Sequence, residues 1–447
     1  MNAEVRLART NAEQALLSAF ERARAGLPGG AQFKRLREQA FAAFAESGLP
    51  HRRIEEWKYT DLRTLLRDAA PLAKPPGAAA IARAKATDPL GGVSLRRLVL
   101  VDGAFVPELS ELGGIEKKLT IVPLAQALAE GHRLAARLGA NQPETYDAAF
   151  ALNTAFLGDG VLIEVGEGAG LERPIHVRHV FSGNDPAATF TRTLFIVGDR
   201  ANASLIESFE GPDRVAYQAN AALLLQVGDR AKAAVTRLQI EGDAAFHVAT
   251  SLVEIGAGSE LWTCALTTGA AVSRHSVTVR FTGQRSSAHL AGATLLRRRQ
   301  HADTTLLLDH AVPACDSREV FKSVLDDESR GIVQGRVVVR PGAQKTDARM
   351  LLGALLLSQS AEADHKPELE IFADDVQCGH GATSGALDEQ LLFYLLSRGI
   401  PRKQAETLLV EAFFGEALEQ IEHEGLREAL KARALAWLSA REQAAAA

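Results

Sequence analysis

A cysteine and a histidine two residues apart, Cys378 and His380, are the side chains in this sequence with the clearest chemical use as metal ligands. In an extended strand, residues i and i+2 point to the same face, so the thiol and the imidazole would lie side by side. A nearby imidazolium favours the thiolate, which is the form that binds metal or attacks sulfur. The flanking Gly379 and Gly381 leave room for another backbone to approach. A buried structural cysteine would produce the same pattern, because cysteine is among the most buried residue types.

The other cysteines and several histidines fit structural positions better. Cys264 lies in the predicted apolar strand Leu261–Leu266 and Cys315 in a loop-like stretch. His301, His310 and His365 are expected on the surface, or in the core with their hydrogen bonds satisfied. Three widely spaced cysteines argue against a disulfide framework and suit a reducing compartment.

Several catalytic signatures are missing from the sequence. The segment Gly342–Thr346 comes nearest to a phosphate-binding loop, but it lacks the adjacent Gly-Lys pair. Neither G-x-G-x-x-G nor H-E-x-x-H occurs, and no C-x-x-C is present to begin a four-thiolate cluster site. The sequence therefore favours a non-catalytic protein.

The composition is that of an ordinary globular protein. The chain has 447 residues, 47% of them hydrophobic, and a net charge of -5, which gives no electrostatic basis for binding nucleic acid. The run Arg297–Arg299 is expected to be a solvated face. The N-terminus has no apolar signal region, and stretches such as Leu351–Leu357 are too short to span a bilayer. We therefore expect a cytoplasmic protein that is not inserted in a membrane.

The first region, residues 1–143, is expected to be mainly helical. Apolar spacing predicts helices over Glu13–Ala25 and Phe33–Glu46, each followed by a glycine. The segment Pro71–Ala80 has the composition of a linker. An Asp-Gly pair between Leu98–Val101 and Ala104–Val106 predicts a β-hairpin.

The middle region, residues 144–387, consists of short apolar or alternating runs separated by glycines, which is typical of strands and turns. The clearest of these predicted strands are Val161–Val165, Thr193–Val197, Ala221–Val227, His247–Ile255, Ser276–Phe281 and Gly335–Val339.

A weak internal repeat runs through the middle region. The segment Val197–Ala203 recurs 30 residues later as Val227–Ala233, with softer echoes at Val165–Ala169 and Ile255–Ser259. Near-equal spacing is what a solenoid requires, because each coil buries its apolar face only against its neighbours. We therefore favour a β-helix, with an antiparallel β-sandwich as the alternative.

The last region, residues 388–447, is expected to be helical. Asp388 is a plausible N-cap for a helix over Glu389–Ser397. Further helices are predicted over Gln404–Ile421 and Leu426–Arg441. Such a tail either caps the end of the solenoid or provides a docking surface.

Blocks spread along the chain resemble the SufB/SufD family of iron–sulfur cluster assembly proteins. They are Ala151–Gly160, Asp316–Gly331, Ala343–Asp347, Lys366–Ile371, Ala373–Val376, His380–Thr383 and Leu391–Ile400. The additional block Arg53–Thr60 is typical of the SufD branch of this family. The chain departs from the family pattern at Met350–Leu357, which is more aliphatic than expected.

The resemblance implies a mainly β fold, a right-handed parallel β-helix core flanked by N-terminal and C-terminal helical regions. It also implies a scaffold subunit that pairs with a SufB-like protein through the end of the β-helix and binds a SufC-like ATPase through the C-terminal helices. The functional interfacial histidine of the family matches His380, and its neighbouring cysteine matches Cys378. A transient iron–sulfur cluster or iron would then be shared with the SufB-like partner. The sequence leaves open whether a flavin binds and whether the isolated chain forms a homodimer.

Two other functions stay open. A stand-alone carbohydrate-processing β-helix enzyme would need paired carboxylates, for which Asp374 with Asp375 or Asp326 with Asp327 are candidates. Adjacent residues of a strand point to opposite faces, which weakens either pair. A SufB-like main scaffold is the second alternative, and the low cysteine count together with the Trp57–Tyr59 block argues against it.

Overall fold

The computed structural model describes residues 8–113, 117–139, 142–143 and 145–446. The first seven residues and the predicted boundary at Glu144 lie outside this part of the chain. In the described part, no helix is long and apolar enough to cross a membrane.

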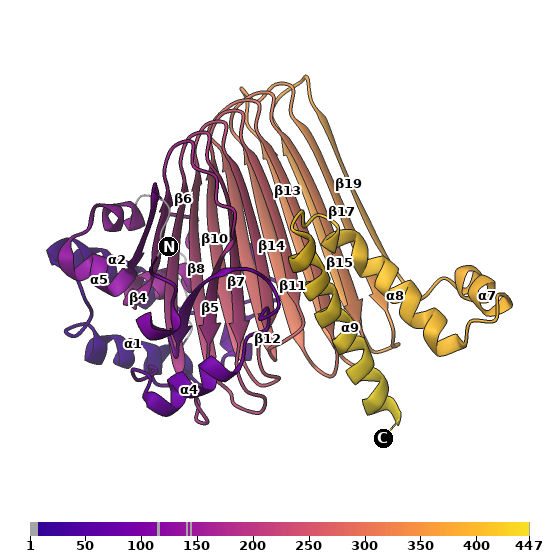
Figure 1. Ribbon diagram of the computed structural model, residues 1–447, viewed down its shortest axis with the longest axis horizontal. Helices are drawn as coiled ribbons and strands as arrows, with labels where there is room; N and C mark the ends of the chain where they lie inside the picture. Colours follow the sequence, from indigo (N-terminus) through magenta and orange to yellow (C-terminus); the bar gives the residue numbers. More distant parts are fainter. Residues whose placement is uncertain (1–7, 114–116, 140–141, 144, 447) are drawn as a thin grey trace, which may run out of the picture.

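A stack of β-coils forms the core, and each coil gives one strand to each of two facing sheets (Figure 1). Within both sheets neighbouring strands are parallel, except for the β1–β2 and β3–β4 pairs. The ten-stranded sheet contains β1 (Arg96–Val101), β2 (Ala104–Phe105), β5 (Ile175–Val180), β7 (Asn202–Glu210), β9 (Lys232–Ile240), β11 (Glu260–Thr267), β13 (Ser287–Leu296), β15 (Asp316–Leu325), β17 (Asp347–Leu356) and β19 (Gln377–Gly385). The nine-stranded sheet contains β3 (Leu119–Pro123), β4 (Asp159–Val165), β6 (Ala188–Val197), β8 (Gln218–Val227), β10 (Phe246–Ile255), β12 (Val272–Phe281), β14 (His301–His310), β16 (Arg330–Val339) and β18 (Glu362–Ile371).

This architecture confirms the predicted parallel β-helix and excludes the antiparallel sandwich. A sandwich would join consecutive strands as antiparallel neighbours, whereas here each strand from β4 to β17 pairs in parallel with the strand two places further along the chain. About eight coils, each made of one even-numbered and one odd-numbered strand, span Asp159–Gly385 in the described chain.

The predicted repeat marks one corner of the solenoid. Val165, Val197, Val227 and Ile255 are in register at the ends of successive strands and are all buried. The glycine after each of the last three donates its N–H to the residue one coil below, for example Gly228 to Val197 at 2.8 Å. A side chain at Gly228 would come within 2.7 Å of the backbone nitrogen of Asp199, so only glycine fits. The repeated glycine therefore marks the place where one coil closely approaches the next.

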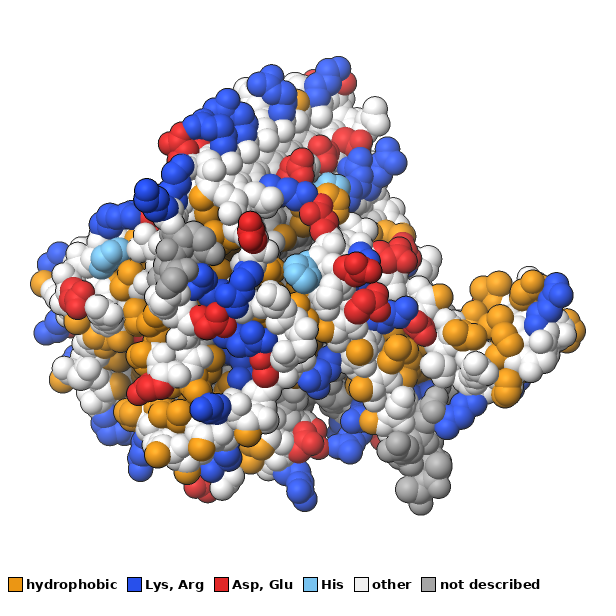
Figure 2. All heavy atoms as spheres, in the orientation of Figure 1, with side chains coloured by type: hydrophobic (Ala, Val, Ile, Leu, Met, Phe, Trp, Pro, Cys, Tyr) orange, Lys and Arg blue, Asp and Glu red, His pale blue; other side chains and the backbone are white. Residues whose placement is uncertain are grey.

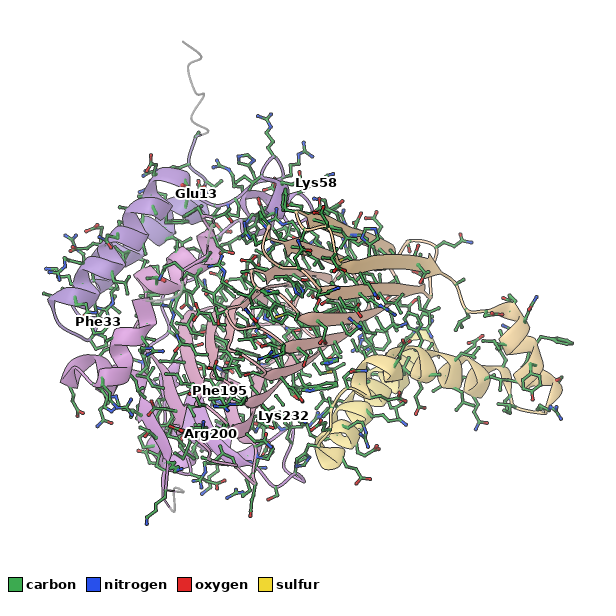
Figure 3. The ribbon with its side chains drawn as sticks, turned by 90° about the horizontal axis from the view of Figure 1, so that it is seen from above. Glu13, Phe33, Lys58, Phe195, Arg200 and Lys232 are labelled. Carbon is green, nitrogen blue, oxygen red and sulfur yellow. The ribbon has the colours of Figure 1, made fainter. Side chains whose placement is uncertain are left out.

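Apolar side chains from both sheets fill the lumen between them. Phe195, Leu225 and Val253 form one row along the nine-stranded sheet and face Leu205 and Val235 of the other sheet in the same core. Figure 3 shows Phe195 inside the stack of strands. Each fully buried side chain of this size contributes about 1.5–3 kcal/mol, so the rows hold the coils together.

Helices cover the N-terminal end of the stack (Figure 1). The predicted helices are confirmed with small shifts of their ends, and Thr10 with Glu13 forms a capping box at the first of them. The predicted Asp-Gly hairpin is confirmed by the antiparallel β1–β2 pair, and both turn residues have positive φ. Part of the predicted linker is helical, because α4 begins at Ala78. The elements of this region are α1 (Asn11–Ala23), α2 (Ala31–Ser47), η1 (Glu55–Trp57), α3 (Leu62–Leu65), α4 (Ala78–Ala86), η2 (Pro107–Leu109), α5 (Leu124–Glu130), η3 (Arg133–Gly139) and α6 (Ala148–Ala155).

The segment Glu55–Thr60, here termed the outer strap, runs across the outer face of the nine-stranded sheet. The guanidinium of Arg274 on β12 lies 3.9 Å from the ring centre of Trp57 and donates to the carbonyl of Glu56 at 2.6 Å. The Thr60 hydroxyl donates to Asp303 on β14. Lys366 on β18 donates to the Glu55 carboxylate. The strap therefore ties the N-terminal region to the last coil.

Three helices follow the last strand, namely α7 (Glu389–Ser397), α8 (Arg402–Leu418) and α9 (Glu424–Ala446). The predicted N-cap is confirmed, since the Asp388 side chain accepts from two backbone N–H groups of α7. Both α8 and α9 pack on the outer face of the ten-stranded sheet, where Phe414 and Leu430 contact a row that includes Cys264 and Ala291. By contrast, α7 projects away from the solenoid (Figure 1).

Buried histidines make the stability of the core depend on pH. His310 is fully buried in the lumen and stacks on Phe281, and burial lowers its pKa from 6.5 to about 4. The folded state thus binds this proton less tightly than the unfolded state, so the free energy of unfolding rises with pH between about 4 and 6.5.

We expect His310→Gln to remove about 2 kcal/mol from the stability difference between pH 5 and pH 7, measured by urea unfolding. The matched control is His132→Gln, a half-buried residue outside the lumen, which should leave the difference unchanged. An unaltered difference in the His310 variant would show that this ring is not the titrating group.

Candidate functional site

The solenoid ends on two strands that are each paired on one side only. In the described chain β18 is paired with β16, and β19 with β17. Their outer edges present backbone N–H and C=O groups that a further strand could pair with. The N-terminal end differs, because β3 pairs antiparallel with β4 and α5 packs against both strands. The C-terminal end is therefore the open end of the stack.

Cys378 and His380 both face the lumen at this open end. In the register of β17 and β19, Cys378 stacks on Ala348 and His380 on Met350, and both of these partners are buried in the lumen core. The thiol and the imidazole thus share one face, as their spacing predicts. Cys378 is half-buried against the core, whereas His380 is exposed because no further coil covers it. A partner seated on this edge would meet both side chains.

The thiol form of Cys378 is favoured in the chain alone, contrary to the expectation that a neighbouring imidazolium stabilises the thiolate. Burial raises the pKa of the Cys378 thiol, and the carboxylates of Asp347 and Glu319 raise it further. A hydrogen bond from the Ala348 backbone opposes this effect without cancelling it. Deprotonation of Cys378 would therefore need a cation from outside the chain.

Below these two residues lies a buried carboxyl group, Glu319 on β15. It occupies the same lumen-facing row as Met350 and His380 and is 0% exposed. Burial raises its pKa from 4.5 to about 8, which the Ser317 hydroxyl and Arg318 offset only in part. Neither carboxylate oxygen has a partner that meets hydrogen-bond geometry among the described residues. Sequence reasoning missed this residue, although it lies within the block Asp316–Gly331.

The other sequence candidates lie elsewhere. Cys264 is buried under α8 with its Sγ 3.5 Å from the Ala417 carbonyl, and Cys315 is buried in a turn, so both are structural as predicted. His301 is on the outer face, 3.0 Å from the Thr60 hydroxyl. His365 faces the lumen on the last coil, in register with the buried Val333.

The aspartate pairs considered for a carbohydrate-processing enzyme lie in turns between strands. Asp326 accepts from Arg441 of α9, and the Asp327 carboxylate accepts the backbone N–H of Arg298. Asp375 forms an ion pair with Lys345. These three carboxylates support turns and helix docking.

No three His, Cys, Asp or Glu side chains converge closely enough to hold a metal ion in the part of the chain that the structure describes. At the open end, Cys378 and His380 supply one sulfur and one nitrogen donor. A stable site for a thiophilic metal normally has four donors. The two residues therefore form at most half of such a site as the chain is folded here.

A second surface lies on the C-terminal helices. The side chains of Leu391, Phe393 and Tyr394 on α7 are 52%, 72% and 54% exposed. Figure 2 shows hydrophobic side chains gathered over this projecting helix. A groove of about 520 Å³ between α7, α8 and the last coils is lined in part by Leu357 and Val410. Exposed apolar area of this kind makes the surface a candidate for contact with another molecule.

Comparison with known proteins agrees with this architecture along most of the chain. Residues 179–413 match the family model for the SUF system FeS cluster assembly, SufBD core domain, and residues 10–177 match that for the SufBD protein N-terminal region. The iron–sulfur cluster assembly protein SufD of Escherichia coli is 29% identical over 89% of this chain and 91% of its own length. A SufBD family iron–sulfur cluster assembly protein of Synechocystis is 30% identical over 83% and 84%. SufD of Bacillus subtilis is 25% identical over 63% and 64%.

The buried carboxyl group predicts a pH dependence opposite in sign to that of His310. The folded state binds the Glu319 proton more tightly than the unfolded state, so the free energy of unfolding falls as pH rises from 4.5 to about 8. We expect Glu319→Gln to stabilise the chain at pH 8, relative to its effect at pH 5, by on the order of 3 kcal/mol in urea unfolding. A variant that is destabilised equally at both pH values would contradict this assignment.

Proposed function

This chain belongs to the SufBD family of iron–sulfur cluster assembly proteins, and on that premise we propose that it is a non-catalytic scaffold subunit of an assembly complex. It pairs with a SufB-like protein through the open end of the solenoid and binds a SufC-like ATPase through its C-terminal helices. One observation carries the proposal: the exposed imidazole of His380, on β19, faces the lumen at the end of the stack where β18 and β19 are each paired on one side only.

The site at the open end is shared between two proteins in this proposal. His380 contributes an imidazole and Cys378 a thiol, while the SufB-like partner brings the remaining sulfur donors. The cluster is cargo that forms at the interface and leaves it. The incomplete donor set of the chain supports this division, because a site built from two donors needs a second polypeptide to hold iron. A metal ion at the interface also supplies the cation that the raised pKa of Cys378 requires.

The three regions then have separate tasks. Residues 1–143 stabilise one end of the solenoid, residues 144–387 carry the interfacial site, and residues 388–447 dock the ATPase. The exposed apolar face of α7 beside the groove at α8 supports the docking assignment. ATP hydrolysis resides in the partner, because this sequence has no phosphate-binding loop. Movement of two ATPase subunits would then reach the interfacial site through α8, which packs against β13 and β15.

His380→Ala should leave the complex intact and abolish cluster assembly. The residue is exposed, so its loss creates no cavity in the core. The measurement is iron and acid-labile sulfide per complex after co-expression with the SufB-like and SufC-like partners, and we expect at least a fivefold loss. His132→Ala serves as the control and should retain the full content. Normal iron and sulfide in the His380 variant would remove this residue from the site.

Reciprocal surface variants should separate the two partners. Phe393→Asp on α7 should abolish co-purification of the SufC-like ATPase, because a charge replaces the most exposed apolar side chain of that helix. Phe372→Asp, in the turn after β18 and 59% exposed, should weaken pairing with the SufB-like protein instead. Each variant is the control for the other, and both should keep the melting temperature of the parent chain. Loss of both partners from either variant would contradict the two-surface assignment.

A further inference from the structure

The burial of the Glu319 carboxyl group in the lumen is energetically unfavourable. It is 0% exposed and lies in a row between Leu290 and Met350, which are both part of the apolar core. Among the described residues, neither oxygen has a partner that meets hydrogen-bond geometry, and the nearby Ser317 hydroxyl offsets its burial only in part. A buried carboxyl group without well-formed hydrogen bonds is destabilising, so its presence in a folded protein needs an explanation.

The position of Glu319 relative to the open end provides that explanation. Glu319, Met350 and His380 lie in register on β15, β17 and β19, and neighbouring strands are about 4.8 Å apart. In the adjacent row, Ser317 and Cys378 are separated only by the small side chain of Ala348. The backbone of Glu319 thus lies two strands, or about 10 Å, from that of His380.

Met350 is the side chain that separates the two groups. Its thioether crosses the lumen and rests against Gly335 on β16, where an added methyl group would lie 2.3 Å from Sδ. The side chain is unbranched and changes rotamer readily. Apart from Met1, it is the only methionine in the sequence. The flexible side chain of Met350 therefore lies between Glu319 and the open end of the lumen.

We propose that Glu319 is a concealed third ligand of the terminal metal site, which it joins when the Met350 side chain swings aside. This inference rests on the proposed function. Glutamate and histidine side chains, together with two metal–ligand bonds of about 2 Å each, can span the 10 Å that separates their strands. Carboxylate, imidazole and thiolate together suit a divalent transition metal such as Fe²⁺. Glu319 and Cys378 each release a proton to water as the metal binds. The partner then supplies the remaining donors.

The test uses Co²⁺ as the probe, titrated into the full-length reduced chain without partners and followed by absorbance. The parent chain should bind one equivalent and show a thiolate-to-cobalt charge-transfer band. Glu319→Gln should weaken the Kd at least tenfold while keeping that band at saturation. Met350→Leu keeps a side chain of similar size but makes it branched and less flexible. This variant should slow association about tenfold and change the Kd less than threefold.

Two controls define the outcome. Glu362→Gln, on the same last coil but on the outer face, should leave the Kd unchanged. Variants His380→Ala and Cys378→Ala should lose binding. A Glu319 variant with the parent Kd, alongside loss in those two, would overturn the ligand role of Glu319 and leave the proposed function standing. Absence of Co²⁺ binding by the parent chain would also overturn it, since the inference requires three donors within one chain, whereas the proposed function is decided by iron and sulfide in the assembled complex.

Discussion

Hydrogen bonding between successive coils is the constraint on which the rest of this structure depends. Because each strand from β4 to β17 is paired in parallel register with a strand of the next coil, the side chains of these coils stack on one another about 4.8 Å apart. Lumen-facing side chains therefore form continuous rows along the stack. The side chains of a row are either apolar or need polar partners within the lumen. Within the stack that the structure describes, the backbone N–H and C=O groups at the outer edges of the last two strands have no further strand to pair with. It ends beneath helices on one side and as free edges, β18 and β19, on the other.

Much of the fold follows from the amino-acid sequence because the coils repeat. The recurrence of Val197–Ala203 at Val227–Ala233 predicted the coil length, and the structure places these segments directly above one another. The six clearest strands predicted from the middle region all lie in the nine-stranded sheet, whereas the predicted strand Leu261–Leu266 lies in the other sheet. Strands of the other sheet were harder to find because lumen-facing charges interrupt their alternation, as Glu207 and Arg237 do in β7 and β9. Strand patterns also do not reveal the direction of pairing, which is why the sandwich stayed open.

The candidate site was predictable only where its residues are close in sequence. The spacing of Cys378 and His380 fixes their common face whatever the strand pairs with. Glu319 acquires its significance from register, since Met350 and His380 are its row neighbours 31 and 61 positions further along the chain. No local pattern contains that information. Likewise, the raised pKa of Cys378 depends on Asp347 and Glu319, which other strands bring near it.

The outer strap has a consequence for how the protein is made. Glu55 and Thr60 leave the ribosome long before Lys366 and Asp303, which are 311 and 243 residues later in the chain. Coils add to one another through nearest neighbours, so they accumulate in the order of translation. The strap can close its contact with Lys366 only after the last coil has formed. Completion of its docking is therefore a late event of biosynthesis. A chain that lacks the last coil can form the strap contacts with Arg274 and Asp303 but not the one with Lys366.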